Sequence, residues 1–234
     1  MLIYEGPNHS KTGNIAVIAT GIDKPSANRK TGDMIQIWIL PADESPSDAI
    51  KSGGDLVVCG TCPLRPWNGG GCYVNVGQAP SSIWNKYKRG GYEKWVPDPY
   101  VYANKPVRIG AYGDVAEIPS EILSDIMGWT KLRGHTCYTH MWRTREDLKY
   151  IAMASVETWS DFMEAGRRGW STFRVTDPNN PEDAEVGSFM CSATKGKVTC
   201  AQCNLCNGAE QRQRAIYIPA HGATAKRVHE TRQE

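Results

Sequence analysis

The second half of the chain alternates between short apolar runs, which have the length of β-strands, and polar runs with helical spacing. The predicted strands are residues 107–114, 135–142, 151–158, 170–176 and 214–222. The predicted helices between them are residues 118–134, 144–150 and 160–169, with Ser120 and Ser160 near two of the helix starts. Strands joined through helices pair in parallel, so this pattern predicts an α/β fold built on a parallel sheet or barrel.

The first part of the chain, residues 1–106, reads as β-rich or irregular. It holds predicted strands at 15–20 and 33–40, a short helix at 45–53 and an amphipathic helix at 81–91. Residues 107–222 hold too few strand–helix units for an eight-fold barrel on their own. We therefore expect a single α/β domain over residues 1–234. The N-terminal strands would complete a compact TIM-barrel-like (β/α) fold, with a cysteine-rich metal-binding insertion at 191–206.

Charge and hydropathy exclude several classes of protein. Lys and Arg total 27 against 25 for Asp and Glu, so the net charge of +2 is too small to argue for nucleic-acid binding by itself. No apolar run is long enough for a membrane span, and the first residues show no secretory signal. We therefore expect a cytoplasmic protein. Disulfides are rare in that compartment, so its grouped cysteines are expected to hold metal.

Seven of the eight cysteines fall into two groups. The later group is Cys191, Cys200, Cys203 and Cys206. Four thiolates are a common zinc site, and His221 or His229 is an alternative to Cys191 as the fourth ligand. The CxxCxxC spacing from residue 200 to 206 also occurs in iron–sulfur proteins, which keeps a cluster open as the alternative.

The earlier group is Cys59, Cys62 and Cys72. It has three readings: a [4Fe–4S] cluster with one open iron, a zinc site completed by His9 or another side chain, or plain loop thiols. The radical-SAM spacing CxxxCxxC is absent from the chain. Cys137 stands apart from both groups and is predicted to be a buried core thiol.

Ionisable residues gather where the predicted strands end, which is where α/β folds place their chemistry. These residues are Asp114, His140, Arg143, Glu157, Thr176, Asp177 and His221. Asp114 follows Gly113, which permits a close approach of backbone or ligand, although a helix-capping role is the alternative. Glu157 follows an apolar run and is a candidate general base or nucleophile, or else a solvated rim residue.

Arg143 stands next to Trp142, and this pair could hold a base by stacking or a phosphate by charge. Two basic segments suit a nucleic-acid backbone, with solvated surface as the alternative for the second. Their candidate contact residues are Arg29 and Lys30 in the first, and Lys86, Lys88 and Arg89 in the second.

An ordered set of motifs runs from about Cys59 to His221. It comprises CxxC followed by GGCYV, a strand ending in GD, a YTxxW strand, a strand ending in SVE, and the later cysteine group. This set resembles a group of bacteriophage proteins whose barrel and late cysteines are similar to those of tRNA-guanine transglycosylases. It also resembles their DNA-acting relatives, the deazapurine-DNA transglycosylases. Two features depart from the tRNA enzymes: CxxCxxC replaces the family's CxCxxC, and the chain is much shorter.

The resemblance implies exchange of guanine in DNA for a 7-deazaguanine base, such as 7-cyano-7-deazaguanine, through a covalent carboxylate–sugar intermediate. Asp114 and Glu157 match the catalytic acids. Glu157 lies nearer the later cysteines, as the family nucleophile does. The family has Asp at that place, however, which favours Asp114 as nucleophile and Glu157 as the base or base-reading residue.

The same resemblance implies zinc on the later cysteines, with His221 as an alternative ligand, and a flipped-out DNA base as the substrate. The residues expected to contact that base are Gln78, Tyr112, His140, Trp142 and Arg143. The cytoplasm would be that of an infected bacterial host. Two other functions remain open: an iron–sulfur protein acting on nucleotides, and a zinc-binding nucleic-acid protein without enzymatic activity.

Overall fold

The computed structural model describes residues 1–26, 28–96, 104–177, 187–209 and 213–220. Its strands are β1 (Leu2–Pro7), β2 (Asn14–Thr20), β3 (Ile35–Pro41), β4 (Val107–Tyr112), β5 (His135–Thr139), β6 (Met153–Val156), β7 (Thr172–Thr176), β8 (Phe189–Met190) and β9 (Ala215–Pro219). Its α-helices are α1 (Pro46–Ser52), α2 (Leu56–Cys59), α3 (Ala79–Lys88), α4 (Ser120–Thr130), α5 (Trp159–Arg167) and α6 (Cys200–Cys203). Short 3-10 helices are η1 (Pro66–Asn68), η2 (Val115–Glu117) and η3 (Glu146–Tyr150).

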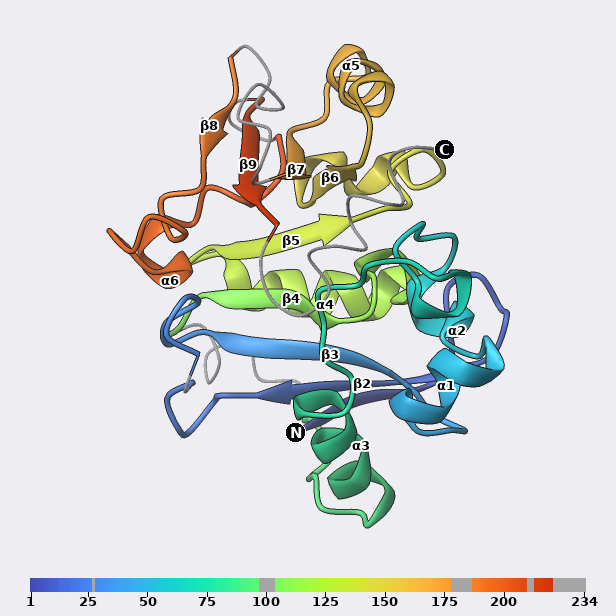
Figure 1. Ribbon diagram of the computed structural model, residues 1–234. Coiled ribbons are helices and arrows are strands. Elements are labelled where there is room, and N and C mark those ends of the chain that lie inside the picture. Colours follow the sequence, from blue (N-terminus) through green and yellow to red (C-terminus); the bar gives the residue numbers. More distant parts are fainter. Residues whose placement is uncertain (27, 97–103, 178–186, 210–212, 221–234) are drawn as a thin grey trace.

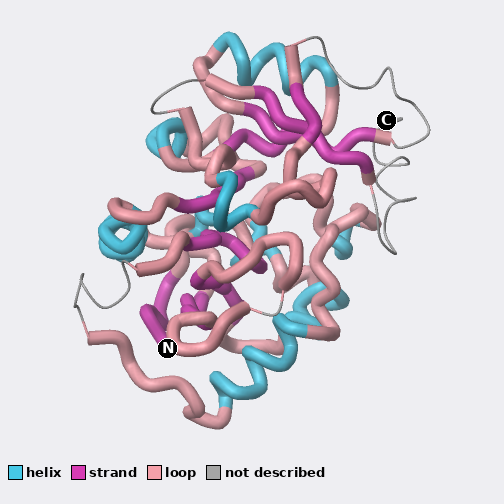
Figure 2. Tube along the Cα trace, turned by 90° about the vertical axis from the view of Figure 1, so that its left-hand side faces the viewer, coloured by secondary structure: helices cyan, strands magenta, loops and turns pink. Residues whose placement is uncertain are grey.

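All of these strands belong to one nine-stranded sheet in the order β1-β2-β3-β4-β5-β6-β7-β9-β8. β1, β2 and β3 pair antiparallel, and every pairing from β3 onward is parallel. The α/β class expected from the sequence is therefore confirmed. In Figure 1 the strands follow one another through the molecule, and the turned view of Figure 2 shows helices outside them.

The sheet is not closed into a barrel, so the expected TIM-barrel closure is wrong for the described residues. β1 and β8 are the two ends of the sheet and do not pair with each other. The physical reason lies at the N-terminus. β1 and β2 form a hairpin beside β3, whereas a (β/α) barrel needs parallel strands joined by helices all the way round. Strand β1, the segment LIYEGP, was missed by the sequence reading.

Local sequence explains several of the helix boundaries. Ser45 caps α1 by accepting a hydrogen bond from the Asp48 amide at 3.1 Å, and Pro46 occupies the first turn. Thr158 caps α5 in a reciprocal capping box with Asp161. The helix cap is therefore Thr158 and not Ser160. A capping box needs an acidic or amide side chain three positions after the cap, and Asp161 lies three positions after Thr158.

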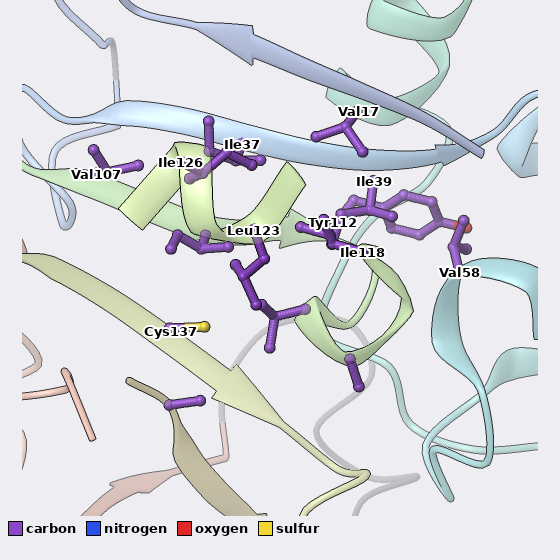
Figure 3. Close-up of a cluster of buried hydrophobic side chains, with 14 of the residues drawn as sticks. Val17, Ile37, Ile39, Val58, Val107, Tyr112, Ile118, Leu123, Ile126 and Cys137 are labelled. Carbon is purple, nitrogen blue, oxygen red and sulfur yellow. The ribbon is translucent and has the colours of Figure 1, made fainter. Parts of the chain in front are cut away.

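The main core lies between the sheet and α4. Leu123 and Ile126 of α4 pack toward Ile37 of β3 and Val107 of β4, and all four are buried (Figure 3). Cys137 lies in the same cluster, fully buried, as predicted for a core thiol. Each large aliphatic side chain buried in this way contributes about 1.5–3 kcal/mol to folding. Among the described helices, none has the length and apolar character needed to span a lipid bilayer.

Candidate functional site

The carboxylate of Asp114 ties two strand ends together. Asp114 follows β4, and its Oδ1 accepts from the Ala116 amide at 3.0 Å while its Oδ2 accepts from the His140 amide at 2.8 Å. The side chain is buried. Each oxygen therefore already accepts a hydrogen bond from the backbone, and the carboxylate fixes the residue that follows β5. The same carboxylate caps η2, which was the alternative role considered for it.

His140 and Glu157 form a pair at the ends of β5 and β6. His140 Nε2 lies 3.0 Å from Glu157 Oε1, and the two side chains are 20% and 12% exposed. The other carboxylate oxygen, Glu157 Oε2, is buried and has no hydrogen-bond partner among the described residues. Leaving a desolvated carboxylate oxygen without a hydrogen bond costs free energy. Glu157 Oε2 is therefore the candidate atom for binding a ligand or a proton.

The earlier cysteine group lies beside this pair. The thiol of Cys62 lies beside the imidazole of His140 and acts on its pKa. Burial alone would lower the pKa of His140, but Cys62 and Glu157 raise it well above its ordinary value. The sequence alone suggested His9 as the partner of these cysteines. The structure instead places His9 in the electrostatic environment of Arg145 and Asp147 and brings His140 to Cys62.

The three thiols of this group are neighbours. Burial raises the pKa of Cys59 well above its ordinary value, and the thiols of Cys62 and Cys72 raise it further. Burial also raises the pKa of Cys72, against the opposing effects of the Val74 amide and of His140. These dependences place the three cysteines and His140 in one electrostatic environment at the carboxyl ends of β4 to β6.

A buried ion pair holds the loop that carries these cysteines. Arg65 lies between Cys62 and Cys72 in the sequence, and its Nη2 lies 2.5 Å from Asp55 Oδ1. The side chains of Arg65 and Asp55 are 8% and 1% exposed. Arg65 also donates to the carbonyl of Gly53 at 2.9 Å. The loop is thus fixed to the start of α2 by charge as well as by the backbone.

Two members of the later cysteine group, Cys200 and Cys203, lie in α6 near the amino-terminal ends of β3 to β5 (Figure 1), whereas Cys191 directly follows β8. Cys200 and Cys203 begin and end α6, and the Cys200 amide donates to the carbonyl of Lys30 at 3.0 Å. Burial raises the pKa of Cys206 to about 12; a hydrogen bond from Tyr138 opposes this shift, and Cys191, Cys200 and Cys203 add to it. All four cysteines therefore lie within electrostatic reach of one another.

Metal binding at either group remains a prediction. Within the described residues, no three His, Cys, Asp or Glu side chains form a ready-made metal-binding group. His221 and His229, considered as alternative zinc ligands, lie outside the described residues.

The residues expected to contact a base are not brought together. Gln78 lines a cavity on the sheet. Tyr112 and Trp142 are buried in the main core. Arg143 stacks on Trp142 at 4.0 Å and is held by Asp161 and Glu164. Of this set, His140 pairs with Glu157, and the buried Tyr112 lies within electrostatic reach of Cys59 and Cys72.

The basic residues considered for a nucleic-acid backbone also separate. Arg29 and Arg89 are exposed, whereas Lys30 lines the cavity. Lys86 lies over the ring of Tyr92 at 4.5 Å. Lys88 donates to the carbonyl of Ala42 at 3.1 Å.

Two features were missed by the sequence reading: the contact of Cys62 with His140, and a basic, aromatic-lined cavity on the sheet. The cavity could have been recognised from the sequence, because Arg108 interrupts the apolar run of β4.

Comparison with protein-family models, curated proteins and solved structures found no significant match.

Proposed function

We propose that this protein is a redox enzyme whose iron–sulfur centre is held by Cys59, Cys62 and Cys72. The observation that carries the proposal is the contact of Cys62 with His140, which itself pairs with Glu157 at 3.0 Å. This contact brings one thiol of the earlier cysteine group and an acid–base pair to one place. That place is the carboxyl end of parallel strands, where α/β folds carry their chemistry.

The donor types support such a centre. Three cysteine thiols are soft ligands suited to iron–sulfur clusters, and Cys59, Cys62 and Cys72 would hold the cluster. When bound, the cluster supplies electrons one at a time. The buried ion pair of Arg65 and Asp55 keeps the intervening loop in place. Hydrogen bonding at a cluster sulfur tunes its potential, and the imidazole of His140, which lies beside Cys62, would take that role in this proposal.

His140 and Glu157 supply proton handling in this proposal. Their contact lets a proton be held between Nε2 and Oε1. Oε2, which has no partner among the described residues, is the atom that takes or gives a proton at the substrate. Asp114 is a positioning residue, because it holds the His140 backbone at 2.8 Å.

The test is metal and sulfide content with an absorption spectrum on anaerobically purified protein. Wild-type protein is expected to contain iron and sulfide and to show broad visible absorption that bleaches with dithionite. Cys72→Ala should lose that absorption, whereas the matched change Cys203→Ala, in the other cysteine group, should keep it. Protein that carries zinc alone would contradict the proposal.

The orphan oxygen of Glu157 favours a second candidate, the base exchange in DNA that the family resemblance implies. Here Glu157 would be the attacking carboxylate, since both oxygens of Asp114 already accept backbone hydrogen bonds. The later cysteines would hold zinc. Labelled guanine or 7-cyano-7-deazaguanine should then enter DNA with wild-type protein and not with Glu157→Gln. Full exchange by Glu157→Gln, or no exchange by zinc-loaded wild-type protein, would rule this candidate out.

A further inference from the structure

A cavity of about 500 Å³ lies on the face of the sheet that carries Trp38, Arg108 and Phe173. Its walls combine residues of β3, β4, β5, β7 and β9 with the loop before β3 and the segment around α3. Its volume lies within the ~300–1,000 Å³ range of small-molecule sites. The segment that closes one side begins at Tyr73, directly after Cys72.

The cavity lining holds two cationic side chains, Lys30 and Arg108, and no Asp or Glu of the described residues. The thiols of Cys191 and Cys200 line it as well. Arg108 makes no ion pair with a described carboxylate. Burial lowers the pKa of Arg108, and Tyr138 and Cys200 oppose that shift. Arg108 is half-buried. A guanidinium partly withdrawn from water and without a carboxylate partner favours an anion, and phosphate matches its paired donors.

The rest of the lining suits a flat ring. Tyr138 and Phe173 lie with ring centroids 4.7 Å apart and present one aromatic wall. Trp38, on β3, contributes a further aromatic face, and its indole N–H is already used by Thr20 Oγ1 at 2.9 Å. Asn75 and Gln78 add amide groups that can pair with the edge of a heterocycle.

We infer that this cavity binds a nucleotide, with the phosphate on Arg108 and Lys30 and the base against the aromatic side chains. This inference gives the proposed redox enzyme a substrate class, the nucleotides, and in that respect the inference rests on the proposed function. The binding itself needs no turnover and no bound cluster. Failure of nucleotide binding can therefore be distinguished from failure of the proposed redox function.

The experiment is calorimetric titration of the full chain with adenosine and guanosine 5′-monophosphates and with the matched nucleosides. A monophosphate is expected to bind at least about tenfold more tightly than its nucleoside. Arg108→Gln should remove that difference and leave nucleoside affinity unchanged. Trp38→Leu should weaken both ligands by about tenfold, because it removes a stacking surface. Arg167→Gln is the matched control, since this Arg is exposed on α5.

Two of the variants already named, Cys72→Ala and Arg108→Gln, separate the alternatives. Cys72→Ala should still bind the monophosphate even where it has lost the visible absorption, so the two proposals can fail separately. Arg108 could instead serve only as counter-charge to Cys200. In that case Arg108→Gln would lose bound metal, and no protein would prefer monophosphate over nucleoside. That result, or equal affinities for wild type and Arg108→Gln, would overturn the inference.

Discussion

The ion pair of Arg65 and Asp55 gives the sharpest stability prediction. The perturbation is Arg65→Met, which keeps an apolar stem of similar length and removes the guanidinium. Arg65 Nε and Nη2 lie 3.2 and 2.5 Å from Asp55 Oδ1, and the carboxylate is 1% exposed. In the variant this carboxylate stays buried without its cation. Its other oxygen, Oδ2, has no described partner to compensate.

The magnitude follows from the burial. Two charges at about 4 Å interact by about 4 kcal/mol at an effective dielectric constant of about 20. Removing one partner of a buried pair costs about 3–5 kcal/mol, because the remaining ion keeps its desolvation penalty. Against a typical total of about 5–15 kcal/mol, the variant should unfold at much lower urea concentration. Arg65→Lys should lose less, since it keeps the charge but not the paired donors.

The assay is urea unfolding at neutral pH followed by tryptophan fluorescence, with all proteins in the same metal state, since bound metal adds its own stabilisation. Arg89→Met is the control, because Arg89 is exposed, and it should change the free energy of unfolding by less than about 0.5 kcal/mol. The double variant Asp55→Leu/Arg65→Met should recover most of the loss. A loss below about 1 kcal/mol for Arg65→Met would refute the reasoning, because the pair would then behave as a solvated one.

Three further predictions concern the neighbouring turn and use the same unfolding assay. Asp114→Ala should cost about 1–3 kcal/mol for each of the two amides it leaves unsatisfied, and Asp114→Asn should cost less; equal losses would contradict this. Gly113→Ala should destabilise the protein strongly, because φ is +82° and a Cβ would lie 2.7 Å from Ile39 atoms. The control Gly196→Ala, at φ +68° with open space around it, should show only the cost of a positive φ in a residue with a Cβ. Burial raises the pKa of Glu117 above its ordinary 4.5, so its contribution is fully present below that pH and is lost as the pH rises through the folded-state pKa. Glu117→Gln should therefore flatten the fall in stability across that window, and an unchanged slope would count against it.

Much of the secondary structure could be predicted because it follows from local patterns. The strand at 135–142 and the helix at 118–134 were placed by apolar spacing, and the structure has β5 and α4 there. Sheet closure could not be predicted, because it depends on which distant strands pair. Nothing in the run IAVIAT (residues 15–20) shows that its neighbours are antiparallel.

The candidate site divides in the same way. The rule that chemistry lies at strand ends correctly grouped Asp114, His140 and Glu157, since their positions in the chain fix which edge they occupy. It could not show that the Asp114 carboxylate accepts hydrogen bonds from two backbone amides, or that Cys62 lies beside His140. Both depend on loop conformations that bring together residues far apart in the chain.

The segment of the later cysteines also supplies a backbone partner to β5. β6 pairs with β5 through Tyr138 and Thr139, while the earlier residue Cys137 donates its amide to the carbonyl of Cys206. The segment of the later cysteines thus takes the place of a strand partner where β6 is too short to supply one. Cys206→Ala removes a buried side chain from this partner segment and should therefore loosen the amino-terminal half of β5, measurable as faster amide exchange there, while the pairing of His140 with Glu157 at the other end is preserved.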